Sequence, residues 1–389
     1  MTSKTLASVP PQHKLDFIQA LRGIAALWVV LYHGSRFISP YGTGLGDLLF
    51  GPAGSMGVVL FFILSGFIMV HTTRNLQGGV WDAAQFLIKR FVRIWPVYAV
   101  VTLCYALVRL GGAGIFDNRV ALGHIAHSLL FLPVGNGPPP QFGWPVLAVG
   151  WTLNYEMYFY ALFGVSLLFG RWRWWALAAW LGVFLVLVPQ LRGAVSLSPA
   201  TDYGFAWSGL QLMTSPIVWQ FIAGVVIGLL YHSHWTLWKP GFLKYLLFLT
   251  MSMAVWQYMS RARMGHGVLD WGTTLIPLVL AFCLASKRFT IPVWGPLVYL
   301  GDISFSLYLW HPLVQEMLSW PLVLTGHGDL TVGFAYLLLT TVVAITVAAI
   351  SRPVLEVWLS DHVKRGLLAL CAPWQRSINN RLLVEKDVT

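Results

Sequence analysis

The apolar segment at residues 16–33 carries two residues that could do chemistry, Arg22 near its start and His33 at its end. Their spacing of eleven residues is about three helical turns, so both side chains lie on nearly the same face, roughly 16 Å apart along the axis. Ionisable side chains are costly in lipid and usually face a bundle interior or a water-filled cavity. This face is therefore interpreted as the wall of a site, in which a neutral histidine can act as a general base. The alternative is that Arg22 extends to the inner interface and His33 lies at the outer water boundary.

Charged side chains occur in two further places beside apolar segments. Lys89, Arg90 and Arg93 form a basic cluster at the inner end of a span. Such a cluster suits a phosphorylated ligand from the cytoplasm, because arginine binds phosphate oxygens through two parallel hydrogen bonds. It is equally explained as a topology signal, since cytoplasmic loops are rich in basic residues. Glu156 lies within the first two turns of the span that begins at Trp151, where a carboxylate needs a partner or a function.

A later apolar segment, at residues 301–312, also carries polar side chains. Ser304, Tyr308 and His311 recur at spacings of four and three residues, so they share one face of a helix. Polar groups in membrane bundles commonly form hydrogen bonds between helices, and this role is favoured here for Ser304 and Ser306. The residues of this segment that we expect to support a site are Asp302, Tyr308 and His311.

The composition is that of a membrane protein. The 389 residues are 57% hydrophobic and only 10% charged, with a mean hydropathy of +0.69, which excludes an ordinary soluble globular protein. The 20 tryptophans and 14 tyrosines suit a chain with many membrane boundaries. The net charge of +11 comes from basic residues spread over short loops, so it indicates topology and not nucleic-acid binding. Cys104, Cys283 and Cys371 are too far apart for a disulfide framework or a zinc site, and no metal site is expected.

Apolar runs long enough to cross a membrane predict an all-α, polytopic bundle of about ten transmembrane helices. Most of the 25 lysines and arginines fall on one side, so the positive-inside rule places both termini in the cytoplasm. We expect a cytoplasmic segment at residues 1–14, the membrane domain at 15–355 and a basic cytoplasmic tail at 356–389. No cleavable signal peptide is evident, so the first run is expected to be a retained anchor. The runs lie at about 15–33, 52–71, 94–110, 151–169, 174–189, 208–231, 242–259, 270–286, 297–319 and 330–350.

Four motifs in a fixed order resemble those of the transmembrane family called acyltransferase 3. They are the first span, residues 65–67 with the basic cluster, residues 151–156 and residues 301–311. Any one of them is a weak signal, whereas the ordered set is specific and covers about residues 15–355. The resemblance implies an integral-membrane enzyme that moves an acyl group, usually acetyl from acetyl-CoA, onto a sugar hydroxyl. The acceptor would be a cell-surface or exported polysaccharide or its lipid-linked precursor, and no tightly bound cofactor is implied.

The resemblance also implies roles for residues of this chain. Arg22 and His33 match the essential arginine and histidine of the family's first helix. Arg90 and Arg93 match its basic motif on the cytoplasmic side, and Glu156 matches the first carboxylate of its fourth-helix motif. The opening of the first helix looks most like members that act on exopolysaccharides.

Three features depart from the family pattern. Met157 stands where many members have a second glutamate, which argues against a two-carboxylate mechanism. Ser351 stands where many members have a glutamate before the Arg-Pro that ends the last span, and Glu356 follows one turn later. No soluble hydrolase-like domain of the kind that some members carry is visible.

These residues suggest a mechanism. Acyl-CoA would enter from the cytoplasm with its phosphates held by the basic cluster, and its pantetheine arm would run past Arg22 toward His33. Neutral His33 would act as general base on the sugar hydroxyl, and Glu156 would orient the imidazole or stabilise its protonated form. A covalent acetyl-histidine intermediate is the alternative chemistry.

Two other function classes compete with acyl transfer. A carrier or flippase for a glycan or small molecule also has many helices with buried ionisable residues, but no internal repeat is visible here. A non-catalytic scaffold of a glycan-synthesis complex would not need a histidine and an arginine on one helix face. The favoured interpretation is an acyl-CoA-dependent O-acetyltransferase of the bacterial inner membrane, in contact with lipid, acyl-CoA and a glycan acceptor.

Overall fold

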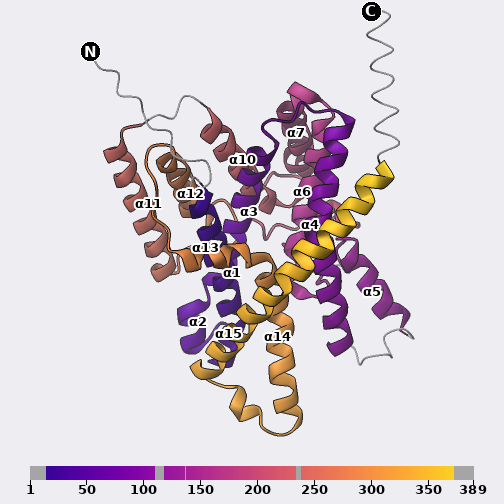
Figure 1. The fold of residues 1–389 in the computed structure, drawn as a ribbon, viewed down its shortest axis with the longest axis vertical. Coiled ribbons are helices and arrows are strands. Elements are labelled where there is room, and N and C mark those ends of the chain that lie inside the picture. Colours follow the sequence, from indigo (N-terminus) through magenta and orange to yellow (C-terminus); the bar gives the residue numbers. More distant parts are fainter. Residues whose placement is uncertain (1–14, 110–117, 136, 234–237, 372–389) are drawn as a thin grey trace, which may run out of the picture. The chain divides into compact units, whose positions relative to one another are not determined.

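The computed structural model describes residues 15–109, 118–135, 137–233 and 238–371, and these residues form helices and connecting turns without β-strands (Figure 1). The all-helical prediction is confirmed for this part of the chain. The chain divides into two compact units. The first comprises the chain up to Arg74, Ser196–Thr201 and Ser215–Ala348, and the second comprises Asn75–Val195, Asp202–Thr214 and the chain from Ala349.

The first unit is organised around α1 (Asp16–Gly34), the helix that carries Arg22 and His33. α1 packs against α3 (Ala53–Thr73), α13 (Gly295–Asp302) and α14 (Ser304–Leu324). α3 packs in turn along α10 (Trp219–His232). The unit also contains α2 (Gly44–Phe50), α11 (Pro240–Ser260), α12 (Gly272–Ser286) and most of α15 (Phe334–Ser351).

The second unit contains the basic cluster and Glu156. Its longest helix is α4 (Val80–Arg109), which packs against α5 (Arg119–Leu129) and α6 (Trp151–Leu167). α7 (Arg173–Gly182) packs against α6 and continues through a π-helical turn, Val183–Leu187. The unit also contains α8 (Val188–Gln190), α9 (Ser208–Thr214) and the π-helical segment Arg352–Leu359.

Several helices have the length and composition of membrane spans. Within the described residues, six helical segments are long and apolar enough to cross a bilayer, and the shorter α12 is also apolar. The chain is therefore a multi-pass membrane protein, while the predicted count of ten spans and the cytoplasmic termini stay predictions. The six segments are Asp16–Phe37, Gly44–Thr73, Val80–Arg109, Gly170–Gln190, Ser208–His232 and Phe334–Cys371.

Helices lie at all ten predicted runs, but three runs differ in detail. The run at 94–110 is only the C-terminal part of α4, because the helix continues through the preceding basic residues, which lower the local hydropathy. The run at 297–319 is two helices, α13 and α14, which meet at Ile303. The run at 208–231 is interrupted at Ser215, whose extended backbone is the conformation favoured before a proline.

Small residues allow α1 to approach its neighbours closely. A Cβ at Gly23 would collide with the backbone of Gly301 and Leu297, and a Cβ at Gly301 would collide with the carbonyl group of Gln19. Membrane helices commonly pack through such small residues, because lipid, unlike water, provides no hydrophobic driving force and close van der Waals contact has to hold the helices together. Glycine at these two positions therefore sets the close contact between α1 and α13.

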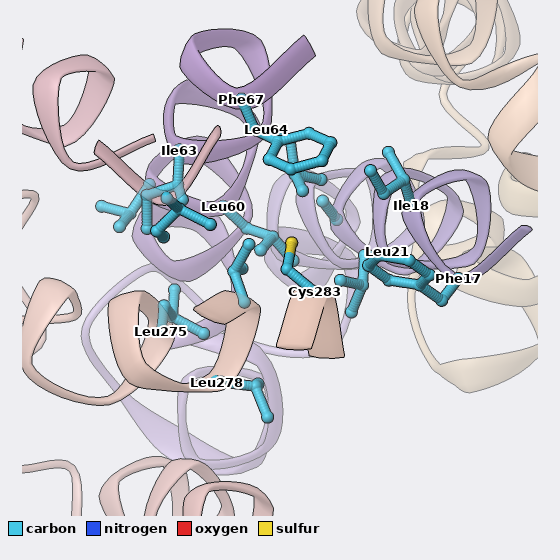
Figure 2. Close-up of a cluster of buried hydrophobic side chains, with 14 of the residues drawn as sticks. Phe17, Ile18, Leu21, Leu60, Ile63, Leu64, Phe67, Leu275, Leu278 and Cys283 are labelled. Carbon is cyan, nitrogen blue, oxygen red and sulfur yellow. The ribbon is translucent and has the colours of Figure 1, made fainter. Parts of the chain in front are cut away.

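The largest apolar cluster of the first unit lies among α1, α3 and α12 (Figure 2). Figure 2 shows Phe17 and Leu21 of α1 beside Leu64 and Phe67 of α3 and Cys283 of α12. This cluster holds the N-terminal half of α1 against its neighbours. Arg22 and His33 are thereby carried on a helix that is packed firmly over its N-terminal half.

Candidate active site

Arg22 is half-buried on α1, and its guanidinium is linked to the neighbouring helix through a glutamine. Nη1 of Arg22 donates to Oε1 of Gln19 at 3.0 Å, and Nε2 of Gln19 donates to Oδ1 of Asp302 at 3.0 Å. The amide between the two charged groups restricts the direction in which the guanidinium points. The structure thus brings together two predicted residues, Arg22 and Asp302, and adds Gln19 to the set.

His33 of α1 faces His311 of α14. Their rings lie 5.0 Å apart between centroids, and Nδ1 of His33 is 3.3 Å from Nε2 of His311. His311 is fully buried, whereas His33 is half-buried. His33 is therefore the member of the pair that can reach a substrate.

Backbone carbonyl groups determine which ring nitrogens carry protons. Nδ1 of His33 lies 2.9 Å from the carbonyl oxygen of Val29, and Nδ1 of His311 lies 3.2 Å from that of Leu307. A carbonyl oxygen only accepts hydrogen bonds, so these contacts assign a proton to Nδ1 of each neutral ring. The N–H at Nδ1 of His33 is then shared between two acceptors, the carbonyl oxygen of Val29 and Nε2 of His311. Nε2 of His33 keeps its lone pair, and it has no hydrogen-bond partner within the described residues.

Polar and aromatic side chains surround this pair. The Tyr308 side chain is buried, and the centroid of its ring lies 6.1 Å from that of the His311 ring. The Tyr41 hydroxyl donates to the carbonyl oxygen of His33 at 2.9 Å. An ion pair of Arg36 with a glutamate of α14 completes the surroundings, with 3.7 Å between Nη1 and Oε1 of Glu316.

Two serines lie at the start of α14. Ser304 and Ser306 are both fully buried. Oγ of Ser304 has no hydrogen-bond partner within the described part of the chain, so the predicted interhelical hydrogen bond is not formed by this residue.

In the second unit, Arg90 of α4 lies between two aromatic rings. Its guanidinium carbon is 5.3 Å from the ring centroid of Phe86 and 5.1 Å from that of Tyr160 in α6. The Tyr160 hydroxyl donates in turn to Oε1 of Glu156. Arg90 and Glu156, predicted from two separate motifs, are thereby joined through Tyr160.

The other two basic residues of the cluster are exposed. Lys89 donates from Nζ to Oε1 of Gln85 at 3.3 Å, and Arg93 lies one turn after Arg90 on the surface of α4. Their exposure suits contact with a soluble ligand, whereas buried Arg90 is held in place by the aromatic rings. The predicted pairing of Glu156 with His33 stays a prediction, because these residues belong to different units.

Asn154 is a site residue that the motif analysis did not single out. It lies two residues before Glu156 on α6, is almost fully buried, and neither amide atom has a hydrogen-bond partner within the described residues. A buried unpaired amide is unusual, and a bound ligand would satisfy it. Local spacing offers a signal for two other missed residues, since Gln19 lies three residues before Arg22 and Tyr160 four residues after Glu156.

Comparison with known proteins identifies the family. The sequence profile of an acyltransferase domain matches residues 15–350. The chain belongs to the acyltransferase 3 family. The resemblance seen in the four ordered motifs is thereby confirmed.

Relatives in the acyltransferase 3 family cover most of the chain. The exopolysaccharide production protein ExoZ of Rhizobium meliloti (strain 1021) is 31% identical over 82% of this chain and 95% of its own length. The acyltransferase MdmB of Streptomyces mycarofaciens is 25% identical over 79% of this chain and 80% of its own. No solved structure matches the chain.

Proposed function

We propose that this member of the acyltransferase 3 family transfers an acyl group, usually acetyl, from acyl-CoA to a hydroxyl of an exported or cell-surface polysaccharide or its lipid-linked precursor. The observation that carries this proposal is the Nε2 lone pair of His33, held outward by the contact with His311. The relationship to an exopolysaccharide production protein supports the glycan acceptor. Ten spans, cytoplasmic termini and a location in the bacterial inner membrane complete the proposal.

His33 is the proposed general base. Its Nε2 takes the proton of the sugar hydroxyl while the hydroxyl oxygen attacks the carbonyl carbon of the thioester. As the carbon–sulfur bond breaks, the imidazolium returns that proton to the CoA sulfur. The products are an ester and a free thiol, and His33 ends the cycle neutral.

His311 is a positioning residue in this mechanism. Its Nδ1 proton is engaged by the carbonyl oxygen of Leu307, so its Nε2 remains an acceptor for Nδ1 of His33. This arrangement holds the ring of His33 in the tautomer that a base requires, as the aspartate does for the histidine of a serine protease. The burial of His311 prevents competing contacts with water.

The charged groups of the second unit are proposed to hold the donor. Lys89 and Arg93 are exposed and suited to the phosphates of acyl-CoA, and the rings of Phe86 and Tyr160 pre-orient the guanidinium of Arg90. Arg22 is proposed to contact the donor farther along its path.

The test uses inverted membrane vesicles that contain the full chain, radiolabelled acetyl-CoA and a glycan extract of the source cell. Wild type is compared with His33→Ala, and with His327→Ala as a matched control, because His327 is exposed in a turn after α14. We expect label in glycan with wild type and the control, and none with His33→Ala. Normal transfer by His33→Ala would overturn the base assignment. Absence of both transfer and CoA binding in the wild type would overturn the proposed function.

A further inference from the structure

A second pair of facing histidines lies in the first unit, outside the candidate active site. Nδ1 of His71, near the end of α3, is 3.1 Å from Nε2 of His232, the last residue of α10. The two rings are half-buried and lie 5.1 Å apart between centroids. Phe67 and Tyr231, which contact this pair, belong to the apolar cluster of Figure 2. The pair therefore lies at the edge of that cluster.

Cations surround this pair. Lys287, which follows α12, donates to the carbonyl oxygen of Ser233 at 2.8 Å and lies 5.8 Å from the ring centroid of Tyr231. The charges of Arg74 and Lys287 both act on His232. Burial, and then repulsion by a neighbouring arginine, lower the pKa of Lys287 below its ordinary value. These groups together make a region of positive potential.

The sequence around these groups contains no acidic residue. Residues 53–81, 203–269 and 271–301, which include all of the groups named above, have neither aspartate nor glutamate. Among the described residues, the charged groups that act on His71 and His232 are basic. The segments that carry these groups therefore supply basic side chains and no carboxylate.

Whichever ring nitrogen carries the shared proton, one outer nitrogen of the pair carries a second proton and can donate a hydrogen bond. If Nδ1 of His71 carries the shared proton, then Nδ1 of His232 carries an outward one. If Nε2 of His232 carries the shared proton, then Nε2 of His71 carries the outward one. Neither outer nitrogen has a hydrogen-bond partner within the described residues, so an N–H group is always available to an acceptor.

We propose that His71, His232, Arg74 and Lys287 form a phosphate-binding site. A phosphate oxygen accepts hydrogen bonds from an imidazole N–H, from a guanidinium and from an ammonium, and it supplies the negative charge that the site requires. Under the predicted topology the site faces the cytoplasm. Its occupant is a phosphate of acyl-CoA, an assignment that rests on the proposed function, or the phosphate of an anionic lipid headgroup.

Helix ends account for only part of this cluster. α3, α10 and α12 end near it, and helix C-termini favour cations through their partial negative charge. That effect explains the contact of Lys287 with the carbonyl oxygen after α10. It does not explain two imidazoles that face each other with their outer nitrogens unpaired.

The test measures binding by the purified full chain in neutral detergent. The variant is the double change Arg74→Gln and Lys287→Gln. The matched control is Lys239→Gln with Lys244→Gln, which removes the same charge from exposed positions of the same unit. The two probes are CoA, measured by titration calorimetry, and phosphatidylglycerol, measured by retention in native mass spectrometry. If the double variant does not remain monodisperse, Lys287→Gln alone is compared with Lys244→Gln.

We expect the variant to bind CoA at least about tenfold more weakly than wild type, and the control to bind it normally. Unchanged CoA binding with lost phosphatidylglycerol retention would assign the phosphate to a lipid headgroup. Unchanged binding of both probes, or no binding of either by wild type, would overturn the proposal. These binding measurements do not depend on catalysis. If the site binds phosphate but the protein transfers no acyl group, the result contradicts the proposed function and leaves the phosphate site standing.

Discussion

His33 and His311 face each other at the C-terminal end of α1, and His71 and His232 face each other at the C-terminal end of α3. The nitrogen separations are 3.3 and 3.1 Å, and the ring centroids lie 5.0 and 5.1 Å apart. The two pairs differ in what they present outward. The first presents a lone pair on Nε2 of His33, whereas the second presents an N–H group in either tautomer.

Backbone contacts cause this difference. The carbonyl oxygens of Val29 and Leu307 engage both Nδ1 atoms of the first pair, so Nε2 is the acceptor of each ring. Nε2 of His311 faces His33, and Nε2 of His33 is therefore the acceptor left for a substrate. No carbonyl contact fixes His71 or His232 within the described residues, and cations act on both rings. The same pair of side chains can therefore hold a base or bind an anion, and the surroundings decide which.

The largest expected effect separates the pairs by alanine substitution. His33→Ala should lower kcat for acyl transfer about 100- to 10,000-fold, the range typical for loss of a general base. His71→Ala should leave kcat nearly unchanged when the donor is saturating. Steady-state kinetics in inverted vesicles at matched protein levels provides the comparison, and equal losses of kcat in both variants would remove the distinction between the pairs.

A smaller effect is expected at the partner of His33. His311→Ala should lower kcat about 10- to 100-fold with little change in KM, because His33 loses the contact that fixes the orientation of its ring. His311→Gln, which keeps an acceptor oxygen, should recover part of that loss. Separate determination of kcat and KM tests this role, and a change confined to KM, or no recovery by glutamine, would contradict it.

The positions of the helices could be predicted because a helix that is buried or in contact with lipid needs a continuous run of apolar residues, which is visible in the sequence. The prediction missed the interruption at Ile303, which lies between Asp302 and Ser304 in a run that is otherwise apolar enough to predict one helix. It also extended the run before Pro216 without a break, although the preference of residues before proline offered a signal.

The candidate site was predictable as a set of residues but not as pairs. Arg22, His33 and His311 stand out because ionisable groups are rare in apolar segments. The contact of His33 with His311 joins residues 278 positions apart, and it depends on the packing of α1 against α14, which spacing cannot reveal. The same holds for Arg90 and Glu156, whose link runs through the aromatic residue Tyr160.

A further prediction concerns the second pair alone. His232→Ala should raise the KM for acyl-CoA about five- to tenfold while kcat changes little, because about one charge-assisted hydrogen bond to phosphate is lost. His327→Ala, at an exposed histidine, is the matched control. A fall in kcat at unchanged KM would show that this pair also takes part in the chemical step.

The smallest effect concerns the charge balance of the first pair. Arg36 acts electrostatically on both His33 and His311, and its ion pair with Glu316 offsets that charge. The side chains of Arg36 and Glu316 are 34% and 14% exposed, so the ion pair contributes about 1 kcal/mol or less. Glu316→Gln keeps the side-chain size but leaves the surroundings of the first pair cationic, as those of the second pair are.

An imidazolium forms on His33 during the proposed transfer, and a net cationic environment disfavours it. Glu316→Gln should therefore lower kcat about two- to fivefold, the equivalent of about 0.4 to 1 kcal/mol in the barrier. Asp329→Asn, at an exposed position after α14, should leave kcat unchanged and serves as the control. An unchanged kcat in Glu316→Gln would mean that the backbone carbonyl contacts alone distinguish the two histidine pairs, because the added cationic character would then have no effect on the base.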